Sequence, residues 1–213
     1  MPHHPKKKTW RATERQTPQW EAKRVAYERE IAAIPPEDRI YLDECGVNRS
    51  MARIYGRAEQ GRRACGARPA KRGTNTTVVG TIDCQGQLMV NTVRSSLKGP
   101  TFAGLLAARV LPYLRPNHVV IMDNLRTHRM PLVRFLIEGV GARLLYLPPY
   151  SPELNPIEEC WSKVKTTLRT MGARTQETVE SAVQAAARMV TPQDAAGWFA
   201  HSDTFLAPKG ASP

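Results

Sequence analysis

Several features that would place the sequence in a familiar class are missing from it. The cysteines are far apart and form no C-x-x-C pair, which argues against a zinc site. No uncharged apolar run approaches the ~20 residues that cross a membrane, and no apolar segment typical of a secretory leader stands at the start. We therefore expect an intracellular protein without membrane association. We also expect reduced core thiols at Cys45, Cys65, Cys84 and Cys160.

Signals for repeats and for nucleotide binding are missing as well. The sequence contains no internal repeat. Gly56 and Gly61 have the spacing of a phosphate-binding loop, but Arg62 and Arg63 stand where such a loop requires Lys and then Ser or Thr. Nucleotide binding by that route is not expected.

Acidic residues are scarce relative to basic ones. The 213 residues include 31 Lys and Arg against 19 Asp and Glu, which gives a formal net charge of +12. Such a charge favours a polyanionic partner, with nucleic acid the first candidate. A basic protein kept soluble by its charge is the alternative.

The positive charge is concentrated in one stretch. Eight cations from Arg49 to Arg72 are accompanied by a single acid, Glu59. We predict that this stretch contacts DNA phosphates, so that binding weakens steeply with salt. A solvated loop without a partner is the alternative. The DNA-binding candidates are Arg53, Arg57, Arg62, Arg63, Arg68, Lys71 and Arg72.

The length suits one domain with tails, which buries roughly 70% of the surface of the unfolded chain. We assign residues 1–36 to a basic tail and a connector helix, 37–190 to the main domain, and 191–213 to a C-terminal tail. The connector helix is predicted to start after Thr17 and to stop before Pro35, because Thr caps helices and Pro ends them. Its apolar stripe, interpreted as a packing surface, consists of Trp20, Tyr27, Ile31 and Ile34.

The main domain begins with strand patterns and continues with alternating strands and helices. This order predicts an α/β fold, a mixed sheet with helices on its faces. The predicted strands cover 40–44, 51–55, 76–82, 88–93, 118–123 and 142–147. The predicted helices cover 101–114, 131–138, a segment that starts at Asn155 or Pro156, and 176–189.

Three carboxylates stand where such a fold can bring them together. Asp43 and Asp123 each follow an apolar strand pattern, and Glu158 stands at the start of a predicted helix. Ligands of open α/β sheets bind beyond the C-terminal ends of strands. Magnesium prefers oxygen ligands, and three carboxylates can hold the two ions of a phosphodiester-cleaving site. We therefore predict a site for two Mg²⁺ or Mn²⁺ ions at Asp43, Asp123 and Glu158.

Ordinary structural roles are possible for the same acids. Asp123 with Asn124 could initiate a turn, and Glu158 could form a capping box with Asn155. Helix geometry favours a ligand role for Glu158. The stripe of Ile157, Trp161, Val164 and Leu168 places Glu158 at the border of the core and Glu159 in solvent.

Two neighbouring residues have open roles. Glu44 follows Asp43, and strand alternation sends the two side chains to opposite faces. His128 could orient a phosphate or the nucleophile, or it could be a half-exposed histidine at a helix start.

The motifs around these acids resemble those of bacterial insertion-sequence transposases of the mariner superfamily, in the IS-six-thirty branch. The similarity runs from about Ile40 to Met189, and 34 residues separate Asp123 from Glu158, the interval typical of the last two acids of the superfamily. The motifs that carry it are Leu42-Asp43-Glu44, Met51-Ala52-Arg53-Ile54-Tyr55-Gly56-Arg57, Val120-Ile121-Met122-Asp123-Asn124, and the run from Leu147 through Pro148-Pro149-Tyr150-Ser151-Pro152-Glu153-Leu154-Asn155-Pro156-Ile157-Glu158 to Glu159.

The resemblance implies a ribonuclease-H-like fold and a catalytic Asp-Asp-Glu triad at Asp43, Asp123 and Glu158, so that 37–190 would be a DDE transposase catalytic domain. It implies metal-dependent hydrolysis at transposon ends, followed by attack of the freed 3′-hydroxyl on target DNA, commonly at a TA step, without a covalent protein–DNA intermediate. It further implies a homodimer in the active state and a bacterial, cytoplasmic protein associated with the nucleoid.

One departure from the family leaves alternatives open. Family members carry helix-turn-helix modules ahead of the catalytic domain, whereas 36 residues precede it here. A separate module or reading frame could supply that function, or the chain could be an inactive relic that only binds DNA without sequence preference. A nuclease acting on RNA–DNA hybrids is a third interpretation, which the proline-rich motif before Glu158 argues against.

Overall fold

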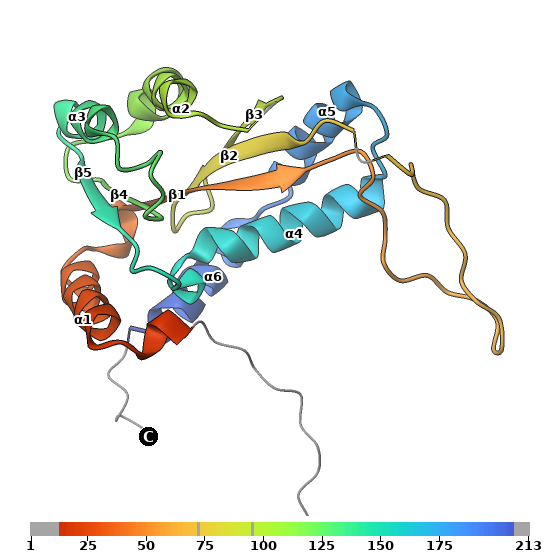
Figure 1. Cartoon of the computed structure of the whole chain (residues 1–213), viewed down its shortest axis with the longest axis horizontal. Helices are drawn as coiled ribbons and strands as arrows, with labels where there is room; N and C mark the ends of the chain where they lie inside the picture. The colour runs from red at the N-terminus through yellow and green to blue at the C-terminus, as the bar shows by residue number, and fades with distance from the viewer. Residues whose placement is uncertain (1–12, 72, 95, 207–213) are drawn as a thin grey trace, which may run out of the picture.

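The computed structural model describes residues 13–71, 73–94 and 96–206, which form a five-stranded mixed sheet covered by helices (Figure 1). The strand order is β3-β2-β1-β4-β5. The β1–β2 and β2–β3 pairs are antiparallel, and the β1–β4 and β4–β5 pairs are parallel. The mixed α/β sheet predicted from the sequence is therefore confirmed. The strands are β1 (Arg39–Val47), β2 (Thr76–Ile82), β3 (Leu88–Val93), β4 (Val119–Met122) and β5 (Arg143–Tyr146).

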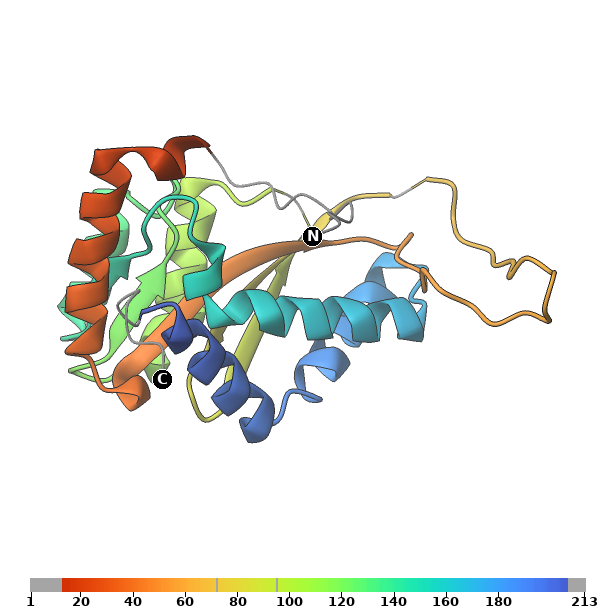
Figure 2. The same cartoon turned by 90° about the horizontal axis from the view of Figure 1, so that it is seen from below.

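Two helical layers cover the two faces of the sheet (Figures 1 and 2). One layer contains α2 (Gly99–Leu105), which continues as a π-helix (Leu106–Val110), and α3 (Pro131–Gly139). The other contains α4 (Pro156–Met171), α5 (Gln176–Ala187) and α6 (Pro192–Thr204), with α1 (Pro18–Ala32) at one end of the sheet. None of the helices within the described ranges is long and apolar enough to cross a membrane.

Alternation along the strands separates the core into two clusters. Tyr41 and Cys45 of β1 face α4, α5 and α6, whereas Leu42 faces α2 and α3. Successive side chains of a strand point to opposite faces, so a single strand contributes to both clusters. The same alternation directs Asp43 and Glu44 to opposite faces, as expected from the sequence.

The segment between β1 and β2 departs from the prediction. Residues 51–55 form no strand, and the whole stretch 48–75, here called the basic loop, has no regular secondary structure in its described part. The loop extends away from the sheet (Figure 2). Met51 packs against the core, but Ile54 and Tyr55 are exposed, so the apolar residues at the end of the predicted strand have no surface to pack against. Instead β1 continues to Val47 and pairs there with β2.

The stretch assigned as a C-terminal tail contains a packed helix. Residues 192–204 form α6, which begins with a capping box between Thr191 and Asp194. Ala195 and Phe199 are buried in the cluster that includes α4. This helix belongs to the layer that covers the sheet.

The connector helix has the predicted N-terminus. The Thr17 side chain accepts a hydrogen bond from the Trp20 amide, and Pro18 occupies the first helical position. Tyr27 and Ile31 are buried, so the stripe is a packing surface as predicted.

Two of the four cysteines are core thiols, as predicted. Cys45 and Cys160 are buried, and burial raises the pKa of each thiol to about 12. Cys84 is half-buried, and Cys65 is exposed on the basic loop. The expectation of a core thiol is therefore wrong for Cys65, because the loop that carries it has no core.

Candidate active site

Two of the predicted acids come from neighbouring parallel strands. In the β1–β4 pair, Leu42 is in register with Met122, so Asp43 and Asp123 occupy the next equivalent positions. Residues in register point to the same face of a sheet. The register therefore gives the two acids neighbouring positions, Asp43 within β1 and Asp123 directly after β4, and both line one pocket.

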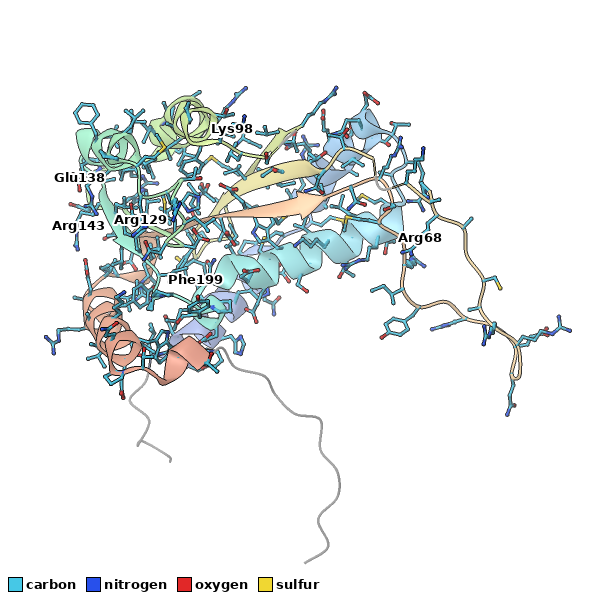
Figure 3. All side chains as sticks on the ribbon, viewed as in Figure 1. Arg68, Lys98, Arg129, Glu138, Arg143 and Phe199 are labelled. Atoms are coloured by element: carbon cyan, nitrogen blue, oxygen red, sulfur yellow. The ribbon has the colours of Figure 1, made fainter. Side chains whose placement is uncertain are left out.

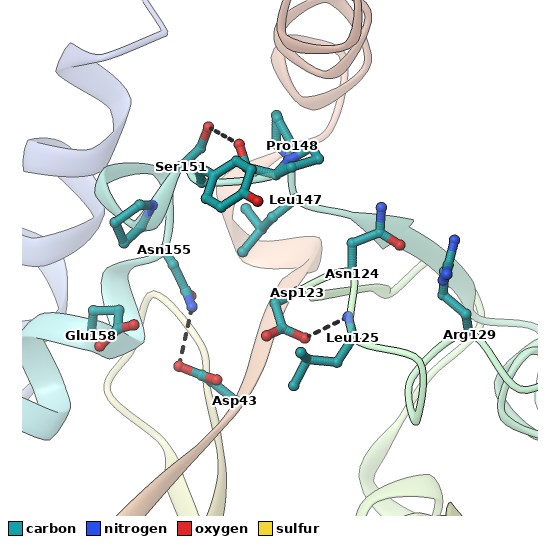
Figure 4. Close-up of a pocket in the computed structure, with 13 residues that line it drawn as sticks. Asp43, Asp123, Asn124, Leu125, Arg129, Leu147, Pro148, Ser151, Asn155 and Glu158 are labelled. Atoms are coloured by element: carbon teal, nitrogen blue, oxygen red, sulfur yellow. Dashed lines mark hydrogen bonds between the residues drawn. The ribbon is translucent and has the colours of Figure 1, made fainter. Parts of the chain in front are cut away.

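The third acid approaches from the helix that crosses this edge. Glu158 lies in the first turn of α4, and it lines the same pocket as Asp43 and Asp123 (Figure 4). The pocket has a volume of about 520 Å³. Its wall opposite β4 is the stretch 147–155 between β5 and α4, here called the proline loop, from which Pro148, Ser151 and other residues line the pocket. All three predicted ligands are thus brought into one pocket.

Burial and charge act together on Asp43. Burial is the main cause that raises the pKa of this carboxyl to about 7, and the negative charges of Glu158 and Asp123 raise it further. The hydrogen bond from the Glu44 backbone N–H, at 2.7 Å from Asp43 Oδ1, acts in the opposite direction. Close carboxylates that repel one another are the arrangement that a divalent cation stabilises.

A buried histidine connects Asp123 to Glu44. The ring nitrogen Nδ1 of His128 lies 2.5 Å from Asp123 Oδ1, and Nε2 lies 3.2 Å from Glu44 Oε1. Burial lowers the pKa of His128, but the hydrogen bonds to the two carboxylates outweigh this effect and raise it to about 9. The ring also packs on Phe102 at 4.7 Å between ring centres. The interpretation of His128 as a half-exposed residue at a helix start is wrong, since its exposed fraction is 0% and α3 starts only at Pro131.

Asp123 both initiates a turn, as one interpretation of the sequence proposed, and lines the pocket. Asp123 Oδ1 accepts a hydrogen bond from the Leu125 amide at 3.2 Å, as a turn-initiating aspartate does. The capping box between Asn155 and Glu158 does not form, because Asn155 makes no side-chain cap of α4. Its amide nitrogen instead donates to Asp43 Oδ2 at 3.3 Å, and its buried Oδ1 has no hydrogen-bond partner among the described residues.

The predicted exposures of Glu158 and Glu159 are reversed. Glu158 is exposed because it faces the open pocket, whereas Glu159 is half-buried and accepts a hydrogen bond from His201 Nδ1 at 2.7 Å. His201 belongs to α6, which was expected to be a tail. A helix wheel drawn for α4 alone could not include the cover that α6 provides.

The pocket offers hard oxygen ligands, which suit Mg²⁺ or Mn²⁺. Asp43, Asp123 and Glu158 supply carboxylate oxygens, and Asn155 also lines the pocket, although its amide oxygen is buried and lacks a hydrogen-bond partner among the described residues. Across the described part of the chain, no three His, Cys, Asp or Glu side chains are arranged closely enough to hold an ion. The donor set therefore fits a hard divalent cation in kind, and ligation would require the carboxylates to draw together.

The predicted DNA-binding residues lie apart from the carboxylates. Arg53, Arg57, Arg62, Arg63, Arg68 and Lys71 are exposed on the basic loop, and Arg72 lies outside the described residues. Figure 3 shows Arg68 on this loop, away from the sheet, and Arg129 close to it. Arg129 is exposed and lines the pocket. Sequence reasoning missed Arg129, although its position one residue after His128 was a possible signal.

Sequence reasoning also missed two cations on α4. At about 100° per residue, Lys165 and Arg169 fall within roughly 20° of the direction of Glu158, and they lie roughly 10 and 16 Å further along the helix axis. Lys163 points to the other side, where it pairs with Asp194 of α6. Helix α4 runs from the pocket to the base of the basic loop (Figure 1), and by helix geometry both cations lie on the side of α4 that carries Glu158.

Comparison with known families gives one match to the chain. The model of a family described as DDE superfamily endonuclease matches residues 38–180. These residues include all three acids of the pocket. None of the curated proteins compared with the chain is significantly similar to it.

Solved structures with a similar fold include several of Mos1 transposase. The Mos1 paired-end complex with the left transposon end superposes with a TM-score of 0.74 at 16% identity, over 97% of this chain and 65% of that chain. The mariner Mos1 paired-end complex with Mg gives 0.70 at 18% identity, over 99% and 68%. The catalytic domain of Mos1 mariner transposase gives 0.61 at 13% identity, over 97% and 94%. At these identities the likeness shows the fold, and the predicted ribonuclease-H-like fold is confirmed. The chain spans about two thirds of the Mos1 transposase in the paired-end complexes.

Proposed function

This chain belongs to the DDE superfamily endonucleases, and on that premise we propose that it is the catalytic domain of a DNA transposase. The motif from Leu147 to Glu159 further supports assignment to the IS-six-thirty branch of bacterial insertion sequences within the mariner superfamily. The reaction proposed is divalent-metal-dependent cleavage at transposon ends and transfer of the freed strand to target DNA.

The observation that carries the proposal is the meeting of three acids from three elements. Asp43 comes from β1, Asp123 follows β4, and Glu158 starts α4, yet all line one pocket. Acids that serve only as turn and cap residues have no reason to share a pocket. A pocket lined by three carboxylates in a chain with a net charge of +12 is the arrangement expected for a metal site that acts on a polyanion.

We assign the metal ligands to the three carboxylates of the pocket. Asp43, Asp123 and Glu158 would hold Mg²⁺ or Mn²⁺, in two sites as in other phosphodiester-cleaving centres. When bound, such ions activate the attacking oxygen and stabilise the leaving oxygen of an in-line displacement. Two uncharged or buried neighbours, one in the pocket and one behind it, position these ligands. Asn155 holds Asp43 Oδ2, and His128 holds Asp123 Oδ1.

The proposed chemistry consists of two displacements at phosphorus. In the first, a water oxygen forms a bond to a phosphorus at the transposon end, and the bond from that phosphorus to the 3′-oxygen breaks. In the second, the freed 3′-hydroxyl oxygen attacks a target phosphorus, and the target 3′-oxygen leaves. Neither displacement needs a nucleophile from the protein, because the attacking oxygens come from water and from DNA. The carboxylates of the pocket are thereby left to bind the metal ions.

The DNA is proposed to run along α4. One strand would pass from the pocket over Lys165 and Arg169 towards the basic loop, whose arginines would contact phosphates further along the duplex. Arg129 would face the strand at the pocket itself. These cations would hold the backbone without reading sequence.

We further propose that sequence recognition comes from a helix-turn-helix module, in the same or a separate chain, and that the active form is a homodimer in the bacterial cytoplasm, at the nucleoid. Two of the Mos1 structures that share the fold are described as paired-end complexes, one of them with the left transposon end. This supports a DNA-bound assembly for the present chain.

A plasmid assay tests the proposal directly. The purified chain is incubated with supercoiled plasmid and Mg²⁺ or Mn²⁺, with and without chelator, and the ends of any nicks are mapped. Metal-dependent nicks with 3′-hydroxyl ends, and joined products in which such an end is linked to new DNA, are expected. Binding without nicking, under either metal and with a helix-turn-helix module added, would favour the DNA-binding relic instead. Preference for an RNA–DNA hybrid would favour a hybrid nuclease.

A further inference from the structure

Helix α1 packs against two different parts of the molecule. Residues 20, 24, 27 and 31 fall on one face of the helix. In the C-terminal half of this face, Tyr27 and Ile31 are buried in the core. In the N-terminal half, Trp20 and Arg24 contact the proline loop. The core therefore fixes α1 independently of its contacts with that loop.

The contacts with the proline loop are specific hydrogen bonds and ion pairs. Trp20 Nε1 donates to the carbonyl oxygen of Pro149 at 2.7 Å. Arg24 Nη1 donates to Glu153 Oε1 at 2.7 Å, and Arg15 pairs with the same carboxylate oxygen. Two points of the loop, Pro149 and Glu153, are thereby tied to one helix.

The cluster around Trp20 is partly shielded from water. The side chains of Arg24 and Glu153 are 12% and 18% exposed. The guanidinium carbons of Arg15 and Arg24 lie 5.2 and 5.5 Å from the centre of the Trp20 ring, within the range of cation–π contacts. A second nitrogen of Arg24 donates to the carbonyl oxygen of Phe205 at 2.9 Å, so the guanidinium is held on two sides. Such pairs are stronger than those of fully exposed side chains.

Both anchored loop residues adjoin groups that shape the pocket. Pro149 precedes Tyr150, which lines the pocket with a φ of 57°, a left-handed conformation that tyrosine rarely adopts. Such a conformation persists only where the surroundings enforce it. Glu153 stands two residues before Asn155, whose amide nitrogen donates to Asp43 Oδ2. One anchor is therefore the immediate neighbour of Tyr150, and the other lies two residues from Asn155.

We propose that Trp20 and Arg24 are positioning residues of the active site. From outside the pocket they hold the proline loop so that Tyr150 lines the pocket and Asn155 contacts Asp43, and the N-terminal helix thereby sets the geometry around Asp43. The catalytic part of this inference rests on the proposed function. The structural part does not, because the conformation of the loop can be measured without any activity.

Hydrogen exchange tests the structural part. The amides of Leu154, Asn155 and Glu158 donate to carbonyl oxygens of the proline loop, so their exchange reports its opening. Trp20→Phe keeps an aromatic ring but removes the N–H donor, and Arg24→Gln removes the ion pair. Exchange of these amides is expected to be about 2- to 10-fold faster in each variant. In Val25→Ala, a matched change at an exposed position of α1, it should equal that of the parent chain. Equal exchange in all three variants overturns the proposal, whether or not the chain cleaves DNA.

Mn²⁺ titration separates positioning from simple loss of folded protein. In Trp20→Phe and Arg24→Gln we expect the same number of ions per chain with a several-fold higher Kd, and Arg24→Lys, which can still pair with Glu153, should recover most of the affinity. Fewer ions bound at unchanged Kd would mean a purely structural role and would overturn the positioning claim. If the parent chain binds no Mn²⁺, the proposed function fails, and the exchange experiment still decides whether α1 holds the loop.

Discussion

The acidic pocket and the basic loop are neighbours along β1 but are constructed differently. Asp43 lies within β1, where Asn155 and the Glu44 amide hold its two carboxylate oxygens. The basic loop begins directly after Val47, and its described cations are exposed. Its Arg62–Glu59 ion pair, at 3.4 Å, joins side chains that are 79% and 82% exposed. Packing and hydrogen bonds therefore hold the acidic pocket in place, whereas the basic loop is held mainly where it joins β1 and β2.

The difference matches the demands that the two proposed tasks make. In-line displacement at phosphorus requires reacting groups held to within a fraction of an ångström, so its residues need a rigid support. Phosphate contacts need only a long cationic side chain within reach, and several weak contacts can together supply the binding free energy. Substitutions in the pocket should therefore have large effects that are not additive, and substitutions in the basic loop should have small effects that add up.

The largest effect is expected from removing an acid of the pocket. Asp123→Ala should lower metal-dependent nicking about a thousandfold, because the ions of such sites supply several kcal/mol of stabilisation to the transition state. DNA affinity should stay within about twofold, since phosphate binding in such proteins comes from the cations. Rates from gel-resolved plasmid nicking and affinities from fluorescence anisotropy measure the two quantities.

Glu138→Ala is the matched control for Asp123→Ala, because it removes an acid on the exposed face of α3. It should leave both the nicking rate and the affinity unchanged. If Asp123→Ala retained nicking, the active site would have to lie elsewhere in the chain.

The next effect concerns the residues that hold Asp123. His128→Phe fills the space of the buried ring on Phe102 but removes both hydrogen bonds, to Asp123 and to Glu44. Loss of a group that orients a metal ligand typically costs 10- to 100-fold in metal affinity or activity. We expect a weaker Mn²⁺ affinity by about that factor, measured by calorimetry.

His118→Phe provides the control, since His118 is also buried but lies just before β4, at its other end. Its Mn²⁺ affinity should equal that of the parent chain. Equal losses in the two variants would mean that general destabilisation, and not the orientation of Asp123, is the cause.

A smaller effect, on the free energy of unfolding, should distinguish the packed sheet from the basic loop. A methyl group at Gly80 of β2 would lie 2.4 Å from the buried Trp161 ring of α4, whereas one at Gly66 of the basic loop would meet nothing within 4 Å. Gly80→Ala should lower the free energy of unfolding by about 1 to 3 kcal/mol, the usual effect of overpacking a core. Gly66→Ala should leave it within about 0.5 kcal/mol. Urea denaturation measures both, and equal stabilities would show that Trp161 has room to move.

The sequence predicted well wherever a pattern is local. The bounds of β2 and β3 agree with the predicted 76–82 and 88–93, because their alternating side chains lie between clear turns. Asp123 was correctly placed at a strand end because it follows a short apolar run, whereas Asp43 lies within β1, which continues to Val47. Their adjacency follows from parallel pairing in register, which the alternation of strands and helices already indicated.

The predictions that failed depended on contacts between distant segments. Residues 51–55 have strand-like composition but no partner strand, and composition cannot supply one. His128 is buried because Phe102, Glu44 and Asp123 surround it, and no local pattern brings these residues together. Glu159 is partly covered by His201 of α6, a helix that the prediction treated as a tail, so the contact could not be foreseen from α4 alone.

The smallest effects are expected in the basic loop, where they also test whether the loop contacts DNA at all. Arg62→Ala should weaken DNA binding about 2- to 5-fold and reduce the slope of log affinity against log salt by about 0.9, the value of one phosphate contact. Arg62→Ala with Arg63→Ala should reduce the slope by about twice as much, because exposed side chains with no shared partner act independently.

Lys165→Ala on α4 is the variant with which these basic-loop substitutions are compared. Removing the Lys165 side chain should reduce the salt slope by a similar amount. It should also lower the nicking rate at saturating DNA, since Lys165 faces the same way as Glu158 and would hold the strand beside the pocket. Titrations at several salt concentrations measure the slopes. An unchanged slope in the double variant, with a changed slope in Lys165→Ala, would assign the phosphate contacts to α4 alone and would leave the basic loop without a role in DNA binding.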